Sequence, residues 1–227
     1  MKKLAWIFAW LTISLPLHAA SLEDLSNKDV VSGLKEALTQ SSSAAVGKLG
    51  QENGFFGNDK VKIPLPDNLR KVEGMMRTFG MGKQADELIL AMNRAAEAAV
   101  PEAKTLLIDA AKKMTVQDAK GILTGGDDAA TAYFRKNTET QLTQKFLPIV
   151  KQSTAKVGLA QSYNSLAGKA AKFGLANEKQ ATIENYVTAK ALDGLYLMMA
   201  EEEKAIRANP LERTGTYIQK VFGILRK

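Results

Sequence analysis

Three polar residues stand in an otherwise apolar stretch near the end of the 227-residue sequence. Tyr186, Lys190 and Asp193 follow one another at steps of four and three residues, so on a helix they share one face. Apolar residues go almost all round such a helix between positions 186 and 200, which is the pattern of a buried central helix. A phenol, an ammonium and a carboxylate converging in an apolar setting could bind an anionic ligand or carry out proton transfer. The alternative is a structural ion pair that ties this helix to a neighbour, and Gly194 indicates close approach of another helix.

The acidic residues further along the same stretch could contribute oxygen ligands to a calcium or magnesium site. Consecutive helical residues point about 100° apart, so Glu201, Glu202 and Glu203 cannot converge on one ion. We expect a solvent-exposed face there, with Glu203 paired to Arg207 four residues later. The GGDD sequence at 125–128 lacks the spaced carboxylates of an EF-hand loop and is typical of one helix ending and another starting. The sequence therefore predicts no metal site and no cofactor.

Composition excludes several classes of enzyme. The sequence has no Cys, and its single histidine, His18, lies within the first twenty residues. The rest of the chain thus lacks the side chains of thiolate zinc sites, disulfides, thiol nucleophiles and histidine-based triads. Paired carboxylates can hydrolyse glycosides, but here the acids are interspersed with bases at helical surface spacings. We expect no catalytic residues, with a carboxylate-dependent glycan hydrolase as the least favoured alternative.

Residues 1–20 have the order of a Sec-type signal peptide. Two lysines precede an apolar run at 4–15, which Pro16 ends before the small residues Ala19 and Ala20. The run is shorter than the roughly 20 residues that a membrane span needs. Without a cysteine the chain cannot be a lipoprotein. We therefore expect a cleaved signal peptide and an exported, periplasmic protein with no transmembrane span.

From residue 21 to residue 227 the sequence predicts a single all-α domain of about eight to ten helices. Apolar residues recur at steps of three and four, and alternating β-branched runs are almost missing. The stretch 51–66 contains several glycines and prolines and is the least helical part. We expect it to be irregular, with a possible short extended piece at 61–63.

Helix starts are marked by polar capping residues. Ser26 with Asp29, and Thr115 with Asp118, match the capping-box pattern, and Asp67 is placed to cap a second helix. The first of these helices is expected to end near residues 47–50, where glycines follow.

Further helices are predicted in the second half of the chain. One should start at Asp127 and Asp128, and another at about Thr138 with an interruption or kink at Pro148. The last long helix should run from near Asn177 to about Ala208, and a final amphipathic helix should follow.

Charge is unevenly distributed along a chain of formal net charge +7. Between residues 129 and 177, Glu139 is the only acid beside the bases Arg135, Lys136, Lys145, Lys151, Lys156, Lys169 and Lys172. This basic segment could face anionic lipid, a glycan or an envelope protein, or it could be a basic surface without a partner. No nucleic-acid motif is present, so we expect no nucleic-acid partner.

Several motifs are distinctive enough to compare with known families: TIENYVTAKALDGLYLMMAEEEKAIRANP at 182–210, Arg213, VFG at 221–223, MNRAAE at 92–97, DAKGIL at 118–123 and AATAYFR at 129–135. Together they resemble the bacterial family catalogued as domain of unknown function 4197, over about Lys28 to Gly223. The resemblance implies an exported, mainly helical protein without an established activity, and it supplies no catalytic residues. One departure is Tyr196, where the LDGLF-like motif has Phe.

The sequence favours a non-catalytic module of the cell envelope that binds a ligand or lipid. The candidate ligand contacts are Tyr186, Lys190, Asp193, Arg94, Glu97, Arg135, Arg207 and Arg213. The alternative is a structural or interaction protein that docks on an anionic surface or a protein partner through its basic segment.

Overall fold

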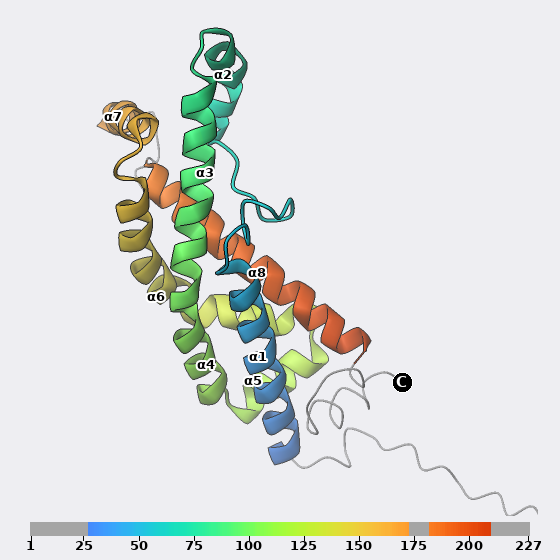
Figure 1. Ribbon diagram of the computed structural model, residues 1–227. Helices are drawn as coiled ribbons and strands as arrows, with labels where there is room; N and C mark the ends of the chain where they lie inside the picture. Colours follow the sequence, from blue (N-terminus) through green and yellow to red (C-terminus); the bar gives the residue numbers. More distant parts are fainter. Residues whose placement is uncertain (1–26, 173–181, 210–227) are drawn as a thin grey trace, which may run out of the picture.

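The computed structural model describes residues 27–172 and 182–209 (Figure 1). Over these residues the chain forms eight α-helices and no strand, which confirms the predicted all-α fold. The helices are α1 (Asn27–Leu49), α2 (Asp67–Thr78), α3 (Gly82–Ala99), α4 (Ala103–Lys113), α5 (Val116–Thr124), α6 (Ala129–Thr154), α7 (Gly158–Lys172) and α8 (Ile183–Ala208), with a short 3-10 turn, η2 (Val100–Glu102), between α3 and α4. The expected signal peptide, the final amphipathic helix and Arg213 lie outside the described residues.

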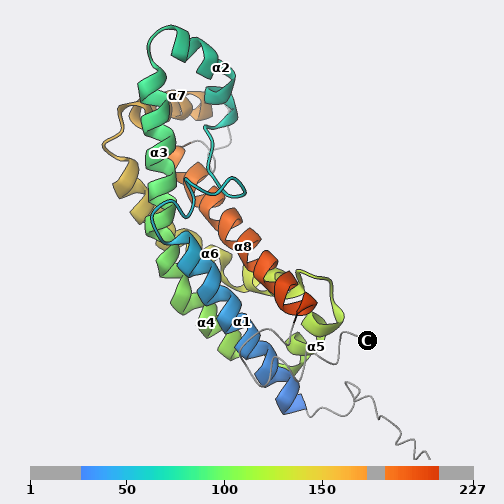
Figure 2. The ribbon, with the colours of Figure 1, turned by 45° about the vertical axis from the view of Figure 1, so that its right-hand side comes forward.

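Helix α8 is the central element of an elongated bundle, and it packs against α1, α3 and α6. Helices α1, α4 and α5 gather at one end of the molecule, whereas α2 and α7 lie at the other (Figures 1 and 2). The long helices α3, α6 and α8 connect the two ends. Their buried apolar side chains form a hydrophobic core to which every helix from α1 to α8 contributes buried or partly buried residues.

The predicted helix starts are confirmed in part. Thr115 and Asp118 form the reciprocal capping box at the start of α5. Asp67 does not cap α2, because it is itself the first helical residue and its carboxylate pairs with Arg70. Helix α8 begins later than predicted, with the Thr182 hydroxyl accepting a hydrogen bond from the Asn185 N–H.

Helix α6 runs without a break where the sequence analysis predicted two helices. Phe134, Thr138, Leu142 and Phe146 follow at steps of four and are all buried, so one apolar stripe continues through the expected boundary. The Thr138 hydroxyl donates to the Phe134 carbonyl within the helix and does not act as a cap. Pro148 lies inside α6, and α7 was not predicted at all.

The 51–66 stretch is irregular, as predicted, and contains no strand. Buried side chains of α3 hold its backbone in place. The Asn93 amide accepts from the Ile63 N–H at 2.8 Å and donates to the Ile63 carbonyl at 2.9 Å. The Glu97 carboxylate accepts from the N–H groups of Phe55 and Phe56, both at 3.0 Å. We call this stretch the buttressed loop.

The buttressed loop packs directly on α8 at Gly194. A Cβ placed at Gly194 would lie 2.7 Å from the Phe55 ring and 3.2 Å from the Val61 Cβ. The close approach predicted for Gly194 is therefore confirmed, although the neighbour is this loop and not a helix.

Replacing Gly194 by Ala is expected to destabilise the protein by up to about 2 kcal/mol, because the methyl group would lie 2.7 Å from the buried Phe55 ring and overpacking costs about 1 to 3 kcal/mol. The net value allows for the roughly 1 kcal/mol that Ala contributes over Gly inside a helix. Urea unfolding measures the change in free energy.

The matched control is Gly121→Ala in α5, where nothing lies within 4 Å of the added methyl. That variant should be as stable as the parent or more so. Equal stabilities for the two variants would contradict the packing at Gly194.

Candidate functional site

The exposed stripe of α8 forms the floor of a surface groove. On its α6 side lies a hollow of about 500 Å³ lined by residues that include Asp128, Arg135 and Leu197. On the side of the buttressed loop lies a second hollow of about 190 Å³, lined in part by Lys60 and Lys190. Asp193 and Leu197 line both hollows, so the hollows adjoin along one face of α8. We call the two together the α8 groove.

The smaller hollow is cationic. Lys60 pairs with Glu201 at 2.6 Å, whereas the ammonium of Lys62 lies 4.3 Å from the centre of the Phe56 ring. The Lys190 ammonium lies 6.0 Å from the centre of the Tyr186 ring. Among residues 27–172 and 182–209, no carboxylate pairs with Lys62 or Lys190 within 4 Å. These two lysines therefore offer positive charge to a ligand.

The larger hollow is more apolar, and its one guanidinium is already engaged. Arg135 donates to Asp193 at 3.1 Å and to Glu139 at 3.3 Å. Its guanidinium lies 4.6 Å from the centre of the Tyr196 ring. Leu197, which is 43% exposed, presents an apolar side chain at the junction of the two hollows.

Tyr196 lies beneath this hollow. Its hydroxyl lies 2.9 Å from the Thr138 hydroxyl, which itself donates to the Phe134 carbonyl, so Tyr196 is the donor. Burial raises the pKa of Tyr196 to about 12, and the phenol stays protonated at neutral pH. The hydroxyl of Tyr196 therefore links α8 to α6.

The predicted cluster of Tyr186, Lys190 and Asp193 does not converge in an apolar setting. Lys190 and Asp193 line the groove but lie on the exposed side of α8. Asp193 is paired with Arg135, which agrees with the structural ion pair given as the alternative. Tyr186 donates instead to the Pro64 carbonyl at 3.0 Å, and burial raises its pKa to about 12. The apolar pattern predicted a central helix, but it did not predict which face of that helix is exposed to solvent.

Arg94 and Glu97 do not line the groove, and their contacts are with the buttressed loop. Glu97 is 5% exposed and accepts the two loop N–H groups described above. Arg94 donates to Glu97 at 2.6 Å and to Glu52 and Asn53 of the loop.

The prediction of an exposed acidic face at 201–203 is wrong for two of the three residues. Glu202 is buried and pairs with Lys48. Glu203 is buried and accepts from the N–H groups of Ala130 and Thr131, at 3.0 and 2.9 Å. Glu203, which lies on α8, thus caps the N-terminus of α6. A carboxylate at this position also interacts favourably with the positive end of the helix dipole.

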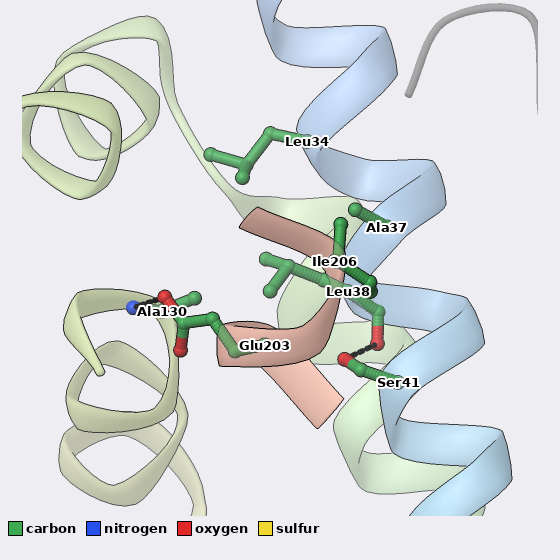
Figure 3. Close-up of a pocket in the computed structure, with 7 residues that line it drawn as sticks. All are labelled: Leu34, Ala37, Leu38, Ser41, Ala130, Glu203 and Ile206. Atoms are coloured by element: carbon green, nitrogen blue, oxygen red, sulfur yellow. Dashed lines mark hydrogen bonds between the residues drawn. The ribbon is translucent and has the colours of Figure 1, made fainter. Parts of the chain in front are cut away.

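Arg207 supports the same contact, since it donates to Glu203 at 2.8 Å, as predicted, and to the Ile122 carbonyl at 3.0 Å. The small hollow beside Glu203 is lined mainly by apolar residues such as Leu34 and Ile206 (Figure 3). Its volume of about 10 Å³ is near that of one water-sized sphere, so it is not a ligand site.

Glu203→Ala is expected to lower the free energy of unfolding by about 3 kcal/mol, because it removes a buried charge partner and leaves two N–H groups unsatisfied. Chemical denaturation of the purified variant measures this loss.

Glu201→Ala is the matched neighbour. Its carboxylate is exposed and pairs only with exposed Lys60 in the described structure, so the change should cost less than about 1 kcal/mol. If Glu203→Ala were as mild as Glu201→Ala, the capping role of Glu203 would be refuted.

Residues that the sequence analysis missed also line the groove, above all Lys60, Lys62 and Leu197. No local pattern distinguished these residues, because the groove exists only once the buttressed loop is placed beside α8. In the described part of the chain, His, Asp and Glu side chains form no cluster that could hold a metal ion. No helix in the described ranges is both long and apolar enough to cross a bilayer.

Comparison with known proteins identifies the family. The model of the family described as "Protein of unknown function (DUF4197)" matches residues 24–223, and the chain belongs to this family. A search of curated proteins and a search of solved structures found no match.

Proposed function

We propose that this DUF4197 protein binds an anionic amphiphile in the α8 groove and does not convert it chemically. The observation that carries the proposal is the meeting of two hollows along one helix, one bordered by lysines and the other more apolar. An acidic head group would lie between Lys62 and Lys190, and an apolar chain would extend over Leu197 towards α6.

The dimensions support a small-molecule ligand. The larger hollow, of about 500 Å³, falls within the range of roughly 300 to 1,000 Å³ that is usual for ligand sites, and the smaller one adds about 190 Å³ beside it. At the junction Asp193 is paired with Arg135, so an apolar chain passing there would not meet an unpaired Asp193 carboxylate. The lysines at one end favour an anionic over a cationic head group.

The proposal includes export to the periplasm, where amphiphiles such as lipids and acidic glycolipids are abundant. It is supported by the signal-peptide pattern of residues 1–20 and by the complete absence of Cys. The absence of His beyond residue 20 supports binding without catalysis, because the commonest general base is not available there.

Isothermal titration with dodecyl phosphate, kept below its micelle concentration, tests the site. We expect saturable binding, and we expect Lys62→Ala with Lys190→Ala to weaken it on the order of tenfold, because two charge-assisted contacts are lost. Dodecyltrimethylammonium, with the same chain and the opposite charge, should not bind.

The control variant is Lys151→Ala, an exposed lysine sixteen residues beyond Arg135 on α6 and thus about 24 Å along the helix. It should bind like the parent. Equal weakening by Lys151→Ala, or unchanged binding by the double variant, would refute the α8 groove as the site. If inorganic phosphate bound with an affinity comparable to that of dodecyl phosphate, the apolar floor of the groove would contribute nothing to the binding free energy.

A further inference from the structure

The last turn of α2 and the turn that leads from it to α3 carry three exposed large apolar side chains. Met75, Phe79 and Met81 are 58%, 79% and 41% exposed, and we call them the apolar tip. The turn lies at the extreme end of the molecule, far from α5 (Figures 1 and 2). Exposed apolar side chains gathered at one end of a molecule favour a contact with a partner or a membrane.

The conformation of the tip is fixed by its charged residues. Arg77 bridges α2 and α3 by pairing with Glu73 and Asp86, both at 2.7 Å. The hydrogen bond from Arg77 lowers the pKa of Asp86, so this pair stays charged at neutral pH. Met76 of the same helix packs into the core. The apolar tip therefore projects from a braced turn.

Cations flank the apolar tip. Lys71 is one helical turn before Met75, and Lys83 is two residues after Met81; both are exposed. No carboxylate pairs with either lysine within 4 Å among the residues described. The two acids nearest the turn, Glu73 and Asp86, both pair with Arg77, and the next acid, Glu87, lies a turn beyond Lys83.

We propose that the apolar tip inserts into the surface of a lipid bilayer that carries anionic head groups. Phe79 and the two methionines would enter the boundary between head groups and acyl chains, with Lys71 and Lys83 at the level of the phosphates. The apolar tip uses none of the residues that line the α8 groove, so the two proposals can fail independently.

The small size of the apolar tip argues against a second copy of the chain as the occupant. A whole large side chain buries on the order of 200 Å², so three partly exposed ones offer a few hundred. A stable protein interface buries about 800 Å² on each partner. A bilayer needs no matching surface, and a few inserted side chains with adjacent cations give reversible binding.

The absence of cysteine permits a single-site test. Phe79→Cys labelled with acrylodan reports the polarity at the tip when vesicles of equal parts phosphatidylcholine and phosphatidylglycerol are added. We expect its emission to shift to shorter wavelength. The control is Val116→Cys with the same label; Val116 is similarly exposed, at 42%, but lies at the start of α5 at the opposite end. Its emission should not change.

Sedimentation with the same vesicles tests the unlabelled chain. Phe79→Ser should lower the partition coefficient on the order of tenfold, and Val116→Ser should leave it unchanged. Lys71→Gln and Lys83→Gln should each lower it about fivefold, but only on vesicles that contain phosphatidylglycerol. Circular dichroism verifies that each variant is folded, and unchanged dodecyl phosphate binding separates this test from that of the α8 groove.

Three results would overturn the proposal. The first is no emission shift at position 79, or an equal shift at position 116. The second is an equal vesicle partition coefficient for the Phe79→Ser and Val116→Ser variants. The third is an emission shift at position 79 that follows protein concentration without vesicles, which would identify a second copy of the chain as the occupant.

Discussion

The architecture depends on the buried Glu97 carboxylate, which binds two backbone N–H groups of the buttressed loop. A segment that is neither helix nor strand must satisfy its backbone polar groups in some other way when it is buried. Glu97 and Asn93 meet this requirement from one side of α3, and Arg94 neutralises Glu97 from the same helix. The loop can therefore lie closely on α8 at Gly194, where a larger residue would separate them.

A second buried carboxylate fixes the opposite wall of the α8 groove. Glu203 caps α6, and Arg207 supports it, so the start of α6 is tied to the end of α8. The α8 groove thus has a floor on one helix and two walls that are each held by a buried acid. A rigid, preformed site lowers the entropic cost of binding, which is consistent with a binding module. Lys62 and Lys190 line the smaller hollow and pair with no carboxylate of the described residues within 4 Å, so their charge is available to an anion.

Sequence predicted the helical class, the irregular loop and the Thr115 capping box, because each depends on neighbours within a few residues. It also had the information for a continuous α6, since Phe134, Leu142 and Phe146 keep one apolar stripe across Thr138. The sequence did not predict helix α7, because Gly158 at its first position and Gly168 within it have low helix propensity. The roles of Glu97 and Glu203 could not be predicted from the sequence. The backbone N–H groups that they bind lie 41 or more residues away, and any sequence would supply such groups.

The most direct test of the account is methyl NMR of the chain with labelled Leu and Met while dodecyl phosphate is added. If the ligand binds in the α8 groove, the Leu197 methyl resonances move first and saturate, and those of fully buried Leu107 in α4 do not move. Perturbation confined to Met75 and Met81 of the apolar tip, or spread evenly over exposed methyl groups with Leu197 unaffected, would contradict a ligand site in the α8 groove.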